Sequence, residues 1–217
     1  MPLAQRAAAH AALADELRLQ VVDLLAGGDL TPGEIRRRIP VASNLLAHHL
    51  GVLEAAGIVN RRRSEADGRR VYIALRRPTV ATATEHHDIT RVLFVCTGNS
   101  ARSQIAEALW REHVTGVAGI SGGTHPADRV EPEAVRTARR HGLDLADATP
   151  RSIAEVAVPG DLIVTVCDSA REELGERATV HWSIPDPVRD GSREAFEAAF
   201  DELSRRVSGL TPHVHAA

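Results

Sequence analysis

The spacing of apolar residues changes near residue 80 of the chain. Before that point it is helical, and one stripe over residues 12–26 consists of Leu13, Leu17, Val21, Leu24 and Leu25. After that point, continuous apolar runs at 91–95 and 162–166 alternate with helical patterns, which is typical of buried parallel strands joined by helices. We therefore expect two domains, at 1–80 and 91–217. The stretch between them, 81–90, has small and polar residues without a period and is interpreted as a linker.

The first domain shows four helical segments and then a β-hairpin. Thr31-Pro32-Gly33-Glu34 forms a capping box with proline at the first helical position, and it opens a short helix. The next helix is expected over about 43–56. Two arginine-containing β-prone runs, 58–63 and 69–75, flank the turn signal Asp67-Gly68. Two short helices followed by such a hairpin predict an α+β winged helix-turn-helix.

The charge of the chain divides at the same place. Residues 1–80 carry 12 arginines and 8 acidic residues, a net +4, whereas residues 81–217 carry 14 arginines and 21 acidic residues, a net −7. A basic winged helix predicts binding to double-stranded DNA, with the second helix in the major groove and the hairpin on phosphates or in the minor groove. A protein-interaction module with a solvated basic ribbon is the alternative. The candidate DNA-binding residues are Asn44, Ala47 and His48 on the helix and Arg61, Arg62, Arg63, Arg69 and Arg70 on the hairpin.

Residues 8–77 resemble the arsenical-repressor (ArsR-type) winged-helix family. The resemblance rests on LADELRLQVVDLL, LTPGEIRRRI and NLLAHHLGVLEAAGIVNRRRSEADGRRVYIAL. It implies a homodimer on a palindromic operator. Many members sense a metal through cysteines on the helix after the capping box, but both cysteines of this chain lie in its second half. This excludes thiolate sensing in the first domain, and we expect no metal site.

The apolar run 91–95 leads into a loop, Cys96–Ser103, which precedes a helical pattern. A loop at a helix N-terminus directs backbone N–H groups and the positive end of the helix dipole into one concavity, which suits a tetrahedral oxyanion. Arg102 can hold two of its oxygens. The same field favours the thiolate form of Cys96, a nucleophile for phosphorus or arsenic, and Ser103 can donate a hydrogen bond to it. The candidate oxyanion-binding residues are Thr97, Gly98, Asn99, Ser100, Ala101 and Arg102.

Two more residues complete the predicted chemistry. Asp186 follows the short strand pattern 179–182 and is assigned as general acid for the departing oxygen, although an Asp-Pro pair is most often only a turn. Cys167 ends the apolar run 162–166. If the sheet has the doubly wound order 2-1-3-4, Cys167 lies beside Cys96 at the topological switch point. It is then either a thiol that attacks a Cys96 adduct to form a disulfide, or an inert buried cysteine.

Residues 91–207 resemble the low-molecular-weight tyrosine phosphatase superfamily, and more closely its arsenate reductase branch. The shared motifs are VLFVCTGNSARSQIAEAL, ISGGTHPA, HGLDLADATPRSI, LIVTVCDSA and HWSIPDP. Gln104 favours the reductases, and so does Val188 where phosphotyrosine recognition would want an aromatic ring. Asn99, Glu107 and Ser121 match positions that support the loop in the family.

Two departures bear on the reductant. Ala101 replaces a cysteine common in the loop, and residues 168–177 lack the third cysteine of the thioredoxin-coupled enzymes. Either an external thiol attacks the Cys96 adduct, as in mycothiol-linked members, or Cys167 forms a disulfide that an external reductant opens. The expected reductant is therefore mycothiol with mycoredoxin, or thioredoxin, and no cofactor is bound.

The sequence thus predicts a dimeric regulator of arsenic resistance, in which a winged helix is fused to an α/β arsenate reductase domain with a four-stranded parallel sheet. Two alternatives stay open: a pure regulator whose enzyme-like domain only senses an oxyanion, and a phosphatase of a small phosphorylated partner. No apolar run approaches ~18 residues, and the N-terminus lacks the order of a secretory signal. We therefore expect a cytoplasmic protein without a membrane span.

Overall fold

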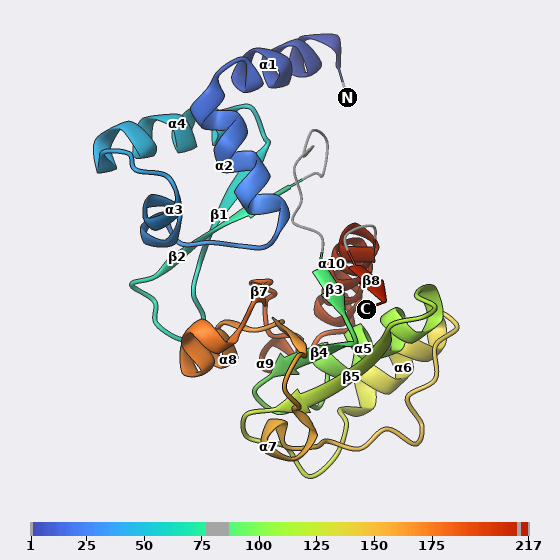
Figure 1. Cartoon of the computed structure of the whole chain (residues 1–217). Coiled ribbons are helices and arrows are strands. Elements are labelled where there is room, and N and C mark those ends of the chain that lie inside the picture. Colours follow the sequence, from blue (N-terminus) through green and yellow to red (C-terminus); the bar gives the residue numbers. More distant parts are fainter. Residues whose placement is uncertain (1, 77–86, 212–213, 217) are drawn as a thin grey trace. The chain divides into compact units, whose positions relative to one another are not determined.

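The computed structural model describes residues 2–76, 87–211 and 214–216 (Figure 1). The chain divides into two compact units, Met1–Glu85 and His86–Ala217. The predicted linker, 81–90, lies outside the described residues as far as position 86. For residues 87–90 the linker prediction is wrong, because strand β3 (His87–Ile89) pairs in parallel with β8 (Val214–Ala216) inside the second unit. A strand of three residues is too short to show the alternation of apolar and polar residues by which strands are predicted.

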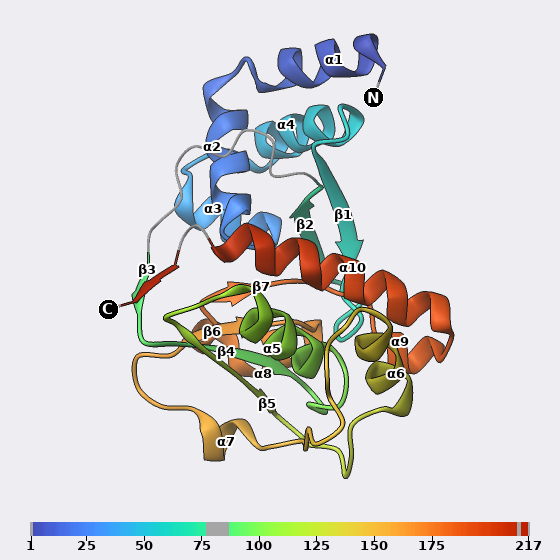
Figure 2. The ribbon, with the colours of Figure 1, turned by 90° about the vertical axis from the view of Figure 1, so that its right-hand side faces the viewer.

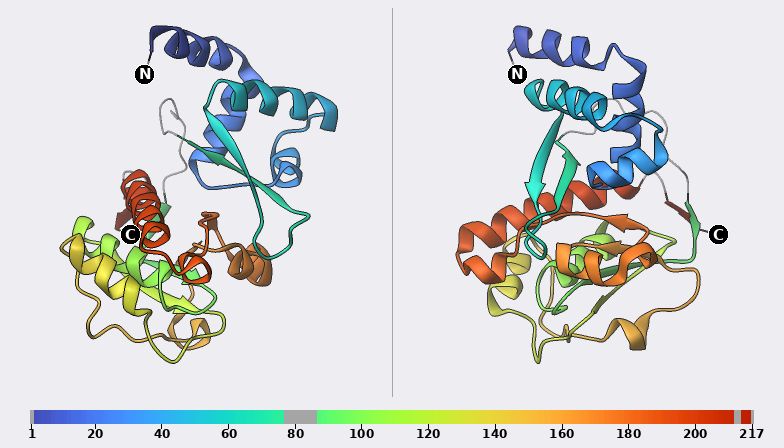
Figure 3. Two further views of the ribbon diagram at one scale, coloured as in Figure 1. Left: turned by 180° about the vertical axis from the view of Figure 1, so that it is seen from behind. Right: turned by 90° about the vertical axis from the view of Figure 1, so that its left-hand side faces the viewer.

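The first unit is a helix-turn-helix followed by a hairpin (Figure 3). Its elements are α1 (Leu3–Leu13), α2 (Glu16–Ala26), α3 (Pro32–Arg38), α4 (Ser43–Ala55), β1 (Val59–Arg63) and β2 (Val71–Leu75). The helix predicted over 12–26 begins only at Glu16, because the Asp15 carboxylate caps it by accepting the N–H of Arg18 at 3.0 Å. The capping box of Thr31 and Glu34 is confirmed.

Local turns join helix α4 to the hairpin. Gly57, with φ of 71°, follows the helix, and its N–H donates to the carbonyl of Glu54 at 2.9 Å. The N–H of Ile58 donates to the carbonyl of Leu53 at 3.0 Å, which completes a Schellman motif. The chain therefore turns directly into β1, which pairs antiparallel with β2. Helices and hairpin share one core, which includes Val21, Leu25, Ile35, Leu46, Leu50, Leu53 and Ile73.

The second unit is a doubly wound α/β domain (Figure 2). Its parallel sheet has the order β5-β4-β6-β7, from β4 (Arg91–Cys96), β5 (Ala118–Gly123), β6 (Leu162–Thr165) and β7 (Val180–His181). This confirms the predicted order 2-1-3-4. The helices are α5 (Arg102–His113), α6 (Pro132–Arg140), α7 (Ile153–Val156), α8 (Asp168–Leu174), α9 (Pro187–Asp190) and α10 (Arg193–Leu210), with a 3₁₀ turn at Gly175–Arg177.

The central strand β4 anchors the core of this unit. The ring of Phe94 lies 5.8 Å from that of Trp110 on α5 and 5.9 Å from that of Trp182, centroid to centroid. Helices α5 and α10 pack against each other, while α8 contacts β4 and β6. The carboxyl ends of β4 and β6 are thereby held side by side, and both cysteines lie there. Among the described helices, none has the length and apolarity needed to cross a bilayer.

Candidate active site

The predicted cysteine loop joins β4 to α5. Cys96 is the last residue of β4, and α5 begins at Arg102. Asn99 has a positive φ of 49°, which folds its backbone N–H back to donate to the Cys96 sulfur at 3.2 Å. The Ser103 hydroxyl lies 3.0 Å from the same sulfur. The loop thus bends around the Cys96 sulfur. The predicted oxyanion-binding residues all lie in it: Thr97 and Gly98 are half-buried, and Asn99, Ser100, Ala101 and Arg102 are buried.

A neighbouring segment holds the outward side of the loop. Backbone N–H groups of residues 124–131 donate to the loop carbonyls of Cys96 (3.1 Å), Thr97 (2.9 Å), Gly98 (2.9 Å) and Ser100 (2.8 Å). These bonds turn the carbonyls away from the concavity, so the N–H groups are available to an anion. Gly123 permits the close approach, because a Cβ there would lie 2.7 Å from the carbonyl oxygen of Thr97.

Arg102 and Asp186 meet although 84 positions separate them. The buried Arg102 guanidinium donates to the carbonyl of Ile184 at 2.8 Å and forms an ion pair of 3.1 Å with the Asp186 carboxylate. Asp186 also accepts the N–H of Val188 at 3.1 Å and so caps α9. The residue therefore has the turn role that its Asp-Pro sequence suggests, and it also touches the anion-binding arginine.

Cys167 contacts the cysteine loop. It caps α8, where its sulfur accepts the N–H of Ala170 at 3.4 Å, and it lies 3.5 Å from the Thr97 hydroxyl. Burial raises the pKa of the Cys167 thiol, and the negative charge of Cys96 raises it further, while Arg102 opposes both. The structure thus brings the two cysteines of the chain to one site, with Cys167 held as the neutral thiol.

A buried polar network supports the loop from behind. The Asn99 amide nitrogen donates to the hydroxyls of Ser103 and Ser121, each at 2.9 Å. Ser121 in turn donates to Glu107 at 2.6 Å. Arg151, which was not predicted as a site residue, joins this network: its guanidinium donates to Glu107 at 2.9 Å, and its backbone N–H donates to the Asn99 amide oxygen at 2.8 Å. Arg151 lies in the shared motif HGLDLADATPRSI, but this stretch has no helical or strand period that would assign the residue a role.

The predicted DNA-binding residues lie on the first unit. Asn44, Ala47 and His48 are exposed on α4; on the hairpin, Arg61, Arg63, Arg69 and Arg70 are exposed and Arg62 is half-buried. Some of the positive charge is already paired, since Arg61 contacts Glu54 at 2.8 Å. His49 is buried, and its Nδ1 lies 3.5 Å from Asp15. Among the described residues, no three His, Cys, Asp or Glu side chains gather to hold a metal ion.

Comparison with known proteins identifies both units. The low molecular weight phosphotyrosine protein phosphatase family matches residues 91–217, and a helix-turn-helix domain family matches residues 13–62. An arsenate reductase of Brevibacillus brevis is 34% identical over 121 residues, covering 54% of this chain and 90% of that protein. A probable low molecular weight protein-tyrosine-phosphatase of Ralstonia nicotianae is 30% identical over 146 residues, covering 59% of this chain and 98% of that protein.

The solved structures agree on the fold of the second unit. The tyrosine phosphatase Wzb from Escherichia coli K30, in complex with sulphate, superposes with a TM-score of 0.51 at 26% identity, covering 57% of this chain and 97% of that one. Residues 91–217 make up more than half of the chain. The chain therefore belongs to the low molecular weight phosphotyrosine protein phosphatase family, with a helix-turn-helix domain ahead of the phosphatase-like unit.

Proposed function

We propose that the second unit is a thiol-dependent arsenate reductase and that the first unit binds operator DNA, which makes the chain a regulator of arsenic resistance. The observation that carries the reductase proposal is the position of Cys167 against the loop of Cys96. Hydrolysis of a phosphate ester needs one thiolate nucleophile, whereas reduction of As(V) to As(III) consumes two electrons, which two thiols supply when they form a disulfide. The similarity to an arsenate reductase supports the same choice.

The surroundings of the site favour a small inorganic anion. Recognition of an aryl phosphate benefits from an exposed aromatic ring at the mouth of the site. Every tyrosine, phenylalanine and tryptophan of the chain is buried, at 6% exposure or less: Tyr72, Phe94, Trp110, Trp182, Phe196 and Phe200. Arsenate needs only the loop N–H groups and the Arg102 guanidinium.

The first step is displacement at arsenic. Arg102 exchanges the Asp186 carboxylate for two arsenate oxygens. The Cys96 thiolate attacks arsenic, an S–As bond forms and an As–O bond breaks. Asp186, released from Arg102, accepts a proton from a hydroxyl of the hydrogen arsenate and passes it to the departing oxygen, which leaves as water. Ser103 donates its hydrogen bond to the Cys96 sulfur and holds it in position for the attack.

The second step is the reduction. Cys167 gives its proton to an oxygen of the bound arsenic group and attacks the sulfur of Cys96, so the S–S bond forms and the S–As bond breaks. The electron pair of the S–As bond stays on arsenic, which leaves as arsenite. The raised pKa of Cys167 orders the two steps, because Cys167 stays protonated while Cys96 carries its negative charge. Thioredoxin, or mycothiol with mycoredoxin, then reduces the disulfide.

The DNA-binding proposal rests on the exposed face of α4 and on the hairpin arginines. Asn44 and His48 are placed to read base edges in the major groove, and the arginines to contact phosphates. The resemblance of residues 8–77 to the arsenical-repressor family supports a homodimer on a palindromic operator.

A turnover assay tests the enzyme. Arsenite formed per chain is counted with thioredoxin and, separately, with mycothiol and mycoredoxin, for the wild type, Cys96→Ser and Cys167→Ser; an aryl phosphate is offered in parallel. We expect multiple turnovers of arsenate by the wild type and none by either variant. Hydrolysis of the aryl phosphate without arsenite would instead establish a phosphatase, and no reaction of either compound would leave an oxyanion sensor.

A further inference from the structure

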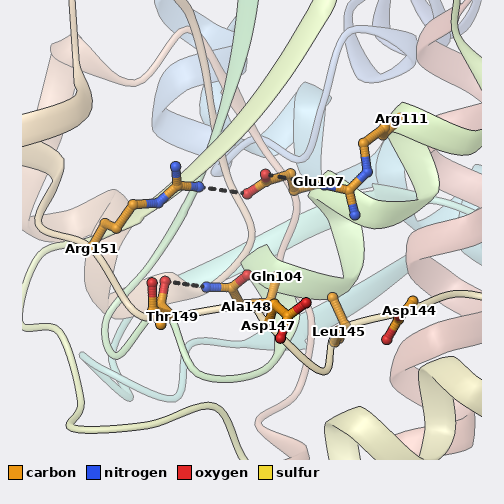
Figure 4. Close-up of a pocket in the computed structure, with 9 residues that line it drawn as sticks. All are labelled: Gln104, Glu107, Arg111, Asp144, Leu145, Asp147, Ala148, Thr149 and Arg151. Carbon is orange, nitrogen blue, oxygen red and sulfur yellow. Dashed lines mark hydrogen bonds and ion pairs between the residues drawn. The ribbon is translucent and has the colours of Figure 1, made fainter.

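A pocket of about 380 Å³ lies behind the cysteine loop, between α5 and residues 144–151. Figure 4 shows Glu107 and Arg151 meeting across it, and Gln104 reaching the backbone carbonyl of Thr149. Arg111 also lines the pocket from α5. The mechanism above uses none of these residues, yet Gln104, Glu107 and Arg151 connect to Asn99 and so to the loop.

In the hydrogen-bond network behind the loop, the donor and the acceptor of each bond can be assigned in only one way. A carboxylate can only accept hydrogen bonds, so Glu107 accepts from both Arg151 and the Ser121 hydroxyl. Because the Ser121 hydroxyl donates its one proton to Glu107, it must accept from the Asn99 amide nitrogen. The second N–H of that nitrogen goes to the Ser103 hydroxyl.

The last bond of the network reaches the nucleophile. Ser103 accepts from Asn99, so its own proton is free to point at the Cys96 sulfur, 3.0 Å away. A hydrogen bond donated to sulfur stabilises the thiolate over the thiol. The orientation of the Asn99 amide is fixed at its other end, because its oxygen accepts from the Arg151 backbone N–H at 2.8 Å and from Gln104 at 3.1 Å.

We propose that Arg151 is a positioning residue which, by fixing the Glu107 carboxylate as a hydrogen-bond acceptor, holds the Ser103 hydroxyl as a hydrogen-bond donor to Cys96. Without the guanidinium, the largely buried Glu107 carboxylate loses the donor that fixes it against Ser121, and the Ser121 hydroxyl is no longer held in its donating orientation. Ser121 would then direct its own proton at the Asn99 amide, and the bond from Asn99 to Ser103 would lose its support. The inference deepens the proposed function, since Cys96 is the nucleophile of that reaction.

The reactivity of the Cys96 thiol tests the inference without arsenate turnover. In a Cys167→Ser background Cys96 is the one remaining cysteine of the chain, and serine is a good replacement for the cap of α8. The rate of alkylation by iodoacetamide, a neutral reagent, is measured as a function of pH. Arg102 and residue 167 face Cys96 in all samples alike, so differences between variants come from the network.

Arg151→Met keeps the backbone N–H and the bulk of the side chain but removes its charge. We expect alkylation at neutral pH to slow by about tenfold, since that is what losing one charge-assisted hydrogen bond costs, and the half-maximal rate to move to higher pH with an unchanged plateau. Arg151→Lys should restore most of the rate, and Glu107→Gln should behave like Arg151→Met. Arg111→Met is the matched control, because Arg111 lines the same pocket but lies 3.8 Å from Glu107 with its side chain 62% exposed; we expect it to leave the profile unchanged.

An Arg151→Met profile equal to that of the background would overturn the inference. So would a lower plateau without a displacement along the pH axis, because that result indicates only a distorted loop. Equal effects of Arg151→Met and Arg151→Lys would also contradict it, since the proposed role requires the positive charge. Arsenate turnover can fail in every sample without affecting these outcomes.

Discussion

Asp186→Asn is expected to change anion binding and turnover in opposite directions. The carboxylate of Asp186 is paired with Arg102, the residue that must grip the anion. Asparagine has nearly the same shape, and its side-chain oxygen can still accept the N–H of Val188, so the cap of α9 persists. The substitution therefore removes the negative charge beside Arg102 and the group that passes a proton to the departing oxygen, with little structural change.

The size of each effect follows from the geometry. The ion pair is 3.1 Å long, with the Arg102 side chain 9% exposed and that of Asp186 31% exposed. A partly solvated pair of this kind contributes about 1 kcal/mol, so releasing Arg102 should tighten anion binding roughly fivefold. Loss of the general acid should lower turnover by about 10²–10⁴-fold.

The two effects are measured separately. Calorimetric titration with phosphate, which thiols do not reduce, gives the dissociation constant of the anion, and arsenite formation gives the turnover. The reasoning is refuted if Asp186→Asn binds phosphate no more tightly than the wild type, or if it retains the wild-type turnover. A fall in binding and turnover together would indicate that Asp186 only supports the loop.

Three further predictions concern other parts of the molecule. Because burial and the charge of Cys96 raise the pKa of Cys167, its alkylation should begin only above the pH of an ordinary thiol, and in Cys96→Ser at a lower pH than in the wild type; equal profiles by mass spectrometry would contradict this. Gly123→Ala places a Cβ 2.7 Å from the carbonyl oxygen of Thr97, so urea unfolding should show a loss of about 1–3 kcal/mol, and unchanged stability would argue against the close approach. Arg63→Ala should reduce the slope of log affinity for DNA against log salt by about 0.9, the value for one phosphate contact; an unchanged slope would remove Arg63 from the interface.

Local signals in the sequence predicted the elements that short-range hydrogen bonds define. The Thr31 capping box and the loop from Cys96 to Arg102 each depend on residues a few positions apart, so their chemistry is visible in one short stretch. The sheet order followed from the apolar runs and the doubly wound rule. The same sheet order was enough to predict that Cys167 lies beside the loop of Cys96.

Contacts between distant segments were not predictable. Arg151 reaches Glu107 and Asn99 across 44 and 52 positions, from a stretch without any period. The pairing of β3 with β8 joins segments more than a hundred positions apart. The sequence placed Asp186 at the same site as Arg102, but the ion pair between them depends on how the chain after β7 packs over the loop. Such contacts arise from tertiary packing, and a single sequence carries no local trace of them.

A single-turnover experiment tests the central claim most directly. The fully reduced protein is mixed with excess arsenate in the absence of any other thiol, arsenite is counted, and the remaining thiols are located by mass spectrometry. The account predicts one arsenite per chain and a disulfide between Cys96 and Cys167. Cys167→Ser should form no arsenite under the same conditions. Bound arsenate with both thiols still reduced and no arsenite formed would contradict the account.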